Sequence, residues 1–87
     1  MRRVVIAWRE TVMEPVEGTG RADLGQRPRM MPQWRPCAVV WARSGSAADV
    51  ESAKRHMQAH RLHGGAVYQY PADEADPIGR AKREVMQ

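Results

Sequence analysis

Three short runs of the chain are rich in β-branched and aromatic residues and have the length of strands. The first is "RVVIAWR" at residues 3–9, which can continue toward Met13. The second is "CAVVWAR" at 37–43, and the third is "GAVYQY" at 65–70, which Pro71 ends. Side chains of these types fit the pleated surface of a sheet, so the pattern predicts three strands.

The alanine-rich segment between the second and third runs has the pattern of a helix. Ser46 is a good N-cap, Asp49 completes a capping box, and Gly64 marks the end. About seventeen helical residues span about 25 Å, which carries the chain back along a strand of about 23 Å. The second and third strands are therefore expected to run parallel, through a right-handed crossover. A shorter helix is expected from Pro77 to about Val85, with Asp76 as its cap.

These elements predict one small α/β domain, α+β-like, over residues 1–87. It has a three-stranded mixed sheet, one crossover helix, a short C-terminal helix and a Pro/Arg-rich arm. The arm is residues 14–36, which hold four prolines and three glycines. Such a composition predicts a long irregular loop, and long loops are usually functional or partly disordered.

The two-residue period of strands divides the expected sheet into a face of small residues and an aromatic face. The crossover helix has Val50, Ala53 and Met57 on one stripe and is expected to pack on the small face. No obvious helix remains for the aromatic face, and exposed apolar surface of that size invites association. The small face collects Val5, Ala7, Ala38, Val40, Ala42 and Val67, and the aromatic face Val4, Ile6, Trp8, Cys37, Val39, Trp41, Ala66, Tyr68 and Tyr70.

The arm contains the segment "RMMPQW", which combines adaptable methionines with a large aromatic anchor. We expect these side chains either to cover the aromatic face or to extend a partner-binding surface beside it, with the prolines preventing a further strand. The predicted partner-binding residues are Arg27, Arg29, Met30, Met31, Trp34, Arg35, Trp41, Tyr68 and Tyr70.

The net charge of +4 comes from twelve arginines and two lysines against ten acids. A basic domain suggests an anionic partner, and residues 24–43 contain four arginines and no acid. The preference for Arg and Ala, with no Phe, is also what GC-rich coding produces. It points to a high-GC bacterium or one of its phages more than to a ligand.

No combination of residues predicts catalysis. His56, His60 and His63 share one face of the expected helix and could bind a metal, but the zinc-hydrolase glutamate is missing. A polar border with favourable charge at the helix end is the better explanation, and no metal or cofactor is expected. Cys37 lies in no nucleophile motif and is expected to be an ordinary thiol. As the one cysteine, it excludes an internal disulfide.

The apolar run after the basic start, Val4 to Trp8, is too short for a secretory signal or a membrane span. A cytoplasmic protein without membrane contact is therefore expected. The predicted function is non-catalytic binding of a protein, as a regulator or inhibitor. The alternative is a nucleic-acid-binding accessory protein that uses the arginine-rich arm and an aromatic sheet face, and a homodimer through that face is a further option.

Overall fold

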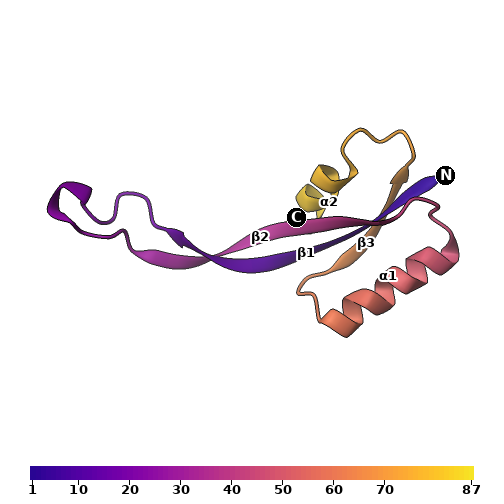
Figure 1. Ribbon diagram of the computed structural model, residues 1–87, viewed down its shortest axis with the longest axis horizontal. Helices are drawn as coiled ribbons and strands as arrows, with labels where there is room; N and C mark the ends of the chain where they lie inside the picture. The colour runs from indigo at the N-terminus through magenta and orange to yellow at the C-terminus, as the bar shows by residue number, and fades with distance from the viewer.

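The computed structural model describes all 87 residues and shows a three-stranded sheet with one helix against each face (Figure 1). This is the small α+β architecture that the sequence predicts. Its elements, in chain order, are β1 (Arg2–Pro15), a short 3-10 helix η1 (Ala22–Leu24), β2 (Met30–Ala42), α1 (Ala47–His60), β3 (Ala66–Pro71) and α2 (Pro77–Val85).

β1 is the central strand, and it pairs antiparallel with both neighbours in the order β2-β1-β3. β2 and β3 thus run in the same direction, as a helical crossover requires, but β1 lies between them. The expected mixed sheet is therefore corrected to one in which every neighbouring pair is antiparallel. The central place suits β1 because its residues Val4 to Ala7 are all fully buried.

Both helices begin at the residues that the sequence predicts. The Ser46 hydroxyl accepts a hydrogen bond from the Asp49 amide, and the Asp49 carboxylate accepts one from the Ser46 amide. Asp76 caps α2 through the Gly79 amide, with a proline in the first turn. The end of α1 comes earlier than expected: it stops at His60, and Arg61 forms the C-cap in the left-handed conformation, with φ of 50°.

α1 covers the opposite face of the sheet from the one expected, and α2 covers the other face. α1 packs its buried Ala53 against Val4 and Ile6, not against the small face. α2 packs Ala81 and Val85 on the other side of the sheet. The side chains that α2 covers are Val5, Ala7 and Tyr70, with Ala38 and Tyr68 partly buried beside them.

The expected aromatic face does not exist as one surface. Tyr68 lies opposite Val5 in the register of β3 with β1, and directly opposite residues share a face. The tyrosines therefore lie under α2. Trp41 stands at a bulge in β2, on the α1 side, with its ring centroid 4.7 Å from that of His56. The period along one strand does not reveal how that strand aligns with its neighbour, and this is why the assignment was wrong.

β1 and β2 continue beyond the body of the molecule as a two-stranded ribbon, drawn toward the left in Figure 1. Their pairing runs out to Pro15 opposite Met30, and residues 16–29 form the tip. The ribbon makes the molecule long: its extents are 57 × 29 × 19 Å and its radius of gyration is 17.4 Å. A compact chain of this length has about 12 Å. Of the arm expected to be irregular, residues 14–15 belong to β1 and residues 30–36 belong to β2.

Prolines fit β2 because they lie where no amide hydrogen is needed. The Arg9 amide donates to the His63 carbonyl at 3.0 Å, so it points away from β2, and amide directions alternate along a strand. Pro36 lies opposite Arg9, and Pro32 lies opposite Met13, four residues further along β1. Both prolines thus occupy pairs that exchange no hydrogen bond with β1, and they face the outer edge. Proline is tolerated there in an edge strand.

Candidate binding surface

The ribbon exposes large apolar side chains that the body cannot cover. Met13 is 58% exposed, and Met30, Met31 and Trp34 are each between 45% and 48% exposed. The register places Met13, Met30 and Trp34 on one ribbon face and Met31 on the other. A two-stranded ribbon has no second layer against which such residues could be buried. These side chains therefore remain accessible to a partner.

Trp34 is held at the root of the ribbon. Its ring stacks on His63 with centroids 4.6 Å apart and planes inclined by 7°. The Arg9 guanidinium lies 5.7 Å from the centroid of the Trp34 ring. One side of the indole is thus covered while almost half of the residue stays exposed, so Trp34 both fixes the ribbon to the body and presents a surface.

Gly64 makes room for this arrangement. A Cβ atom at this position would clash with the Arg9 guanidinium, and the φ of +60° at Gly64 is in the region that favours glycine. A larger residue would displace Arg9 from its place beside Trp34.

A groove of about 450 Å³ lies between the root of the ribbon and the end of α1, and we call it the root groove. Arg9 and Arg61 line it, and neither forms an ion pair within the chain. Arg9 Nε is buried without a hydrogen-bond partner. The carboxylate of Glu10, also in the lining, accepts a hydrogen bond of 3.0 Å from Trp8 Nε1. The remaining lining residues are Trp8, Thr11, Trp34, Leu62 and His63.

Sequence reasoning missed Arg9 and Arg61 because no local pattern connects them. Arg9 looks like the end of a strand, and Arg61 looks like an ordinary basic residue near a helix C-terminus. Only the hydrogen bond from β1 to the turn after α1 brings the two together.

Acidic side chains lie close to several arginines of the arm, so the positive charge of the arm is lower in the folded structure than its sequence suggests. The Arg35 guanidinium donates to both carboxylate oxygens of Glu14, and this contact lowers the pKa of Glu14. Arg21 pairs with Asp23 at 2.9 Å. Residues 9–36 contain five arginines and four acids, and β1 places Glu10 and Glu14 beside the acid-free segment. Arg27 and Arg29 form no ion pair in the structure.

The nine predicted partner-binding residues do not form a single surface. Tyr70 is only 4% exposed, and its hydroxyl donates to Glu84 Oε2 at 2.8 Å. Burial, and then the Glu84 carboxylate, raises the pKa of Tyr70. It belongs to the core under α2 and is not available to a partner. Tyr68 stacks beside it, and Trp41 lies on the opposite side of the sheet. The six residues Arg27, Arg29, Met30, Met31, Trp34 and Arg35 lie on the ribbon or its tip.

The three histidines do not lie together. The rings of His56 and His60 lie 4.2 Å apart on α1, whereas His63 follows the helix and stacks on Trp34. The expected shared face of three histidines is wrong because α1 ends at His60. No group of three His, Cys, Asp or Glu side chains is placed to hold a metal ion.

Cys37 is in an environment that disfavours the thiolate. Partial burial, and then the nearby Glu10 carboxylate, raises the pKa of its thiol, and the charge of Lys82 opposes this only in part. Reactive cysteines have the opposite environment, which lowers the pKa.

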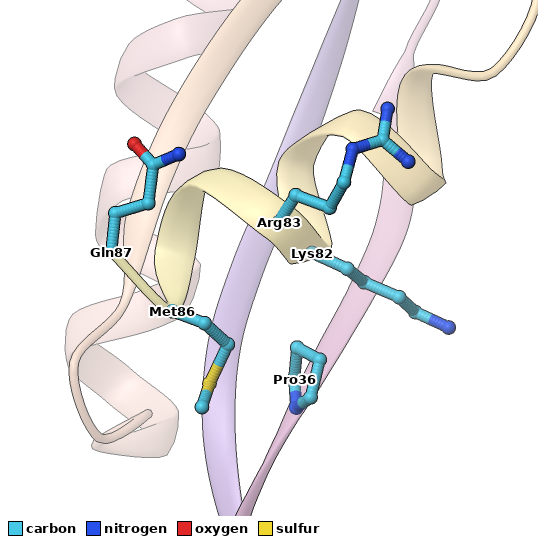
Figure 2. A pocket seen from close by; sticks show the side chains of 5 residues that line it. All are labelled: Pro36, Lys82, Arg83, Met86 and Gln87. Atoms are coloured by element: carbon cyan, nitrogen blue, oxygen red, sulfur yellow. The ribbon is translucent and has the colours of Figure 1, made fainter.

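A second hollow, of about 390 Å³, lies between the end of α2 and β2. Figure 2 shows that Lys82 and Arg83 extend in different directions from the helix, while Met86 and Pro36 lie close to each other. The two positive charges do not converge on one point, so this hollow lacks the geometry of an anion site.

None of the helices is both long enough and apolar enough to cross a membrane. Comparison with models of known families, with curated proteins and with solved structures finds no match.

Proposed function

We propose that this chain is a non-catalytic binding protein that regulates or inhibits a partner protein through its projecting ribbon. The observation that carries the proposal is the set of exposed apolar side chains on the ribbon, Met13, Met30, Met31 and Trp34. Tryptophan is enriched among the residues that dominate interface energetics, and methionine adapts its shape to a partner. We also propose a cytoplasmic location and a high-GC bacterial or phage source, which the arginine-rich composition supports.

The alternative function, nucleic-acid binding, has one structural observation in its favour. A two-stranded ribbon has the right width for the major groove of DNA, and Arg27 and Arg29 at its tip lack ion-pair partners. The near-balance of charge along the ribbon argues against it, because phosphate binding depends on an excess of positive charge. We therefore favour a protein.

Salt dependence separates the two functions. The affinity of the chain for random-sequence duplex DNA and for single-stranded RNA is measured at low and at moderate salt. In parallel, proteins that bind the chain are recovered from a bacterial lysate with and without nuclease, and their affinity is measured at the same salt concentrations. We expect the recovered partner to survive nuclease and to bind with little salt dependence.

A matched pair of variants assigns the contact to the ribbon. Met31→Ser removes an exposed apolar ribbon side chain, whereas Met86→Ser removes one near the C-terminus. Only the first should weaken binding. Tight, steeply salt-dependent binding to nucleic acid that is lost in an Arg27→Gln, Arg29→Gln variant would contradict the proposal and establish the alternative.

A further inference from the structure

One edge of the ribbon has unpaired backbone groups. β3 pairs with β1 only as far as Ala7, and the last hydrogen bond on that side joins the Arg9 amide to His63. Because amide directions alternate, the N–H groups of Thr11 and Met13 point to the same side, where β3 no longer runs. β1 therefore has a free edge beyond Arg9, in line with the start of β3.

The other edge of the ribbon is interrupted by prolines. Pro32 and Pro36 occupy two of the outward-facing positions of β2, on either side of Trp34, and provide no amide hydrogen there. Proline on an edge strand is one of the ways in which proteins prevent edge-to-edge pairing. The free edge of β1 has no such protection before Pro15. A strand from another molecule would therefore pair more readily with β1 than with β2.

The root groove lies at the beginning of this free edge and contains groups that lack a partner. The guanidinium groups of Arg9 and Arg61 form no ion pair, and Arg9 Nε is buried without an acceptor. A buried donor without an acceptor is rare in folded proteins. The unpaired guanidinium groups therefore favour a carboxylate supplied from outside the chain.

We propose that an extended, acidic segment of the partner protein adds as a third strand along the free edge of β1 and places a carboxylate in the root groove against Arg9 and Arg61. This proposal rests on the proposed function and names the chemistry of the partner. Main-chain hydrogen bonds supply the affinity in this mode of recognition, and side-chain contacts supply the specificity. The exposed Met13 and Trp34 lie on the same ribbon face as Arg9 and can contact alternate residues of the segment.

Two other occupants fit less well. A phosphodiester backbone has no alternating amide and carbonyl groups to pair with Thr11 and Met13. A second copy of β1, paired antiparallel about Val12, would place Glu10 opposite Glu14, and like charges directly opposite destabilise a strand pair.

The probe is a peptide selected from a random phage-displayed library on the full-length chain, then synthesised and measured by calorimetry. We expect it to alternate apolar residues and to contain an acidic one. Arg9→Gln and Arg61→Gln should each weaken it by about tenfold or more, as should conversion of its acid to the amide. Arg55→Gln changes an exposed arginine of α1 outside the groove and should leave affinity unchanged.

A backbone substitution tests the strand addition itself. Met13→Pro removes an outward N–H without breaking a bond to β2, and Met13→Ala removes the side chain but keeps the N–H. The proline variant should bind about tenfold more weakly than the alanine variant. Amide hydrogen exchange of wild-type protein gives an independent result: Thr11 and Met13 should exchange more slowly when the peptide is present.

Other results would overturn the proposal in distinguishable ways. Strand addition is wrong, and the ribbon function stands, if no acidic peptide is selected. The same holds if the affinity of the selected peptides is unchanged by Met13→Pro and Arg9→Gln but is lowered by Met31→Ser. If no selected peptide depends on any ribbon residue, both fail. If the chain self-associates and Met13→Pro abolishes this, the partner of the free edge is a second copy of the chain. If duplex DNA displaces the peptide, the partner is a nucleic acid.

Discussion

Trp34 has a double role because only part of its ring is covered. One side stacks on His63 beside Arg9, which anchors the ribbon, and 45% of the residue remains exposed. Trp34 therefore does not cover the sheet, and it is not free of the body either. A single aromatic residue fixes the angle of the ribbon and still presents an apolar surface.

Truncation of Trp34 should affect both stability and binding. Trp34→Ala should lower the free energy of unfolding by about 1–2 kcal/mol, less than the 3–5 kcal/mol of a fully buried tryptophan, because one side already contacts water. It should weaken partner binding by about 2 kcal/mol. Urea unfolding and calorimetry measure the two effects. His63→Ala removes the stacking partner alone and should lower stability while affecting binding less. A Trp34→Ala protein that matches the wild type in both measurements would leave Trp34 without either role.

Tyr70 connects β3 to α2 and makes stability depend on alkaline pH. Its pKa is raised by burial and by Glu84, so the fold favours the neutral phenol. The resulting stabilisation is fully present below the pKa of an unfolded tyrosine, about 10, and is lost as the pH rises above it. Tyr70→Phe should lower stability by about 1–2 kcal/mol near neutral pH through loss of the hydrogen bond to Glu84.

The pH profile distinguishes this role from simple packing. Between neutral pH and pH values above about 10, the free energy of unfolding should fall more for the wild type than for Tyr70→Phe. Parallel profiles for the two proteins would show that the phenol does not respond to its environment in this way.

At the scale of elements, α1 approaches the sheet closely because its contact residue is small. Ala53 is fully buried against Val4 and Ile6, with Val50 and Met57 packed at the sides. Ala53→Leu should therefore overpack this contact and lower the free energy of unfolding by about 1–3 kcal/mol. Ala59→Leu places the same side chain on an exposed position of α1 and should change stability little. Equal melting temperatures for the two variants would contradict the observed packing.

The whole molecule consists of a small body and a ribbon that contributes no buried residue beyond Ala7 in β1. Both buried clusters, one under α1 and one under α2, lie within the body. The body should therefore fold without the outer ribbon. In isolation the ribbon would be marginally stable, because two strands with no packed layer bury little apolar surface.

Removal of the outer ribbon tests this division. Residues 13–32 are replaced by Asn-Gly, which suits a two-residue turn between the paired residues Val12 and Gln33. We expect a melting temperature within about 5 °C of the wild type, since both clusters remain, and loss of partner binding. Solution scattering should show a radius of gyration that falls from 17.4 Å toward about 12 Å. An unfolded product would show that the ribbon supports the body.

Local interactions were predictable from the sequence alone. Ser46 with Asp49, and Asp76 with Pro77, mark helix starts because the atoms that bond are at most three residues apart. The buried run of β1 and the small α+β class follow from the same kind of local pattern. The apolar ribbon residues were also recognised as unusual, although their secondary structure was not.

Long-range pairing decided the rest. Proline disrupts a strand only where its missing N–H is needed, and whether Pro32 and Pro36 face a neighbour or solvent depends on which side β1 pairs. Strand register likewise placed Tyr70 in the core and Trp41 on the opposite face. Arg9 and Arg61 meet in the root groove only because β1 bonds to the turn after α1. A linear pattern contains the period of each strand but not its neighbours, so the candidate site arose from tertiary structure.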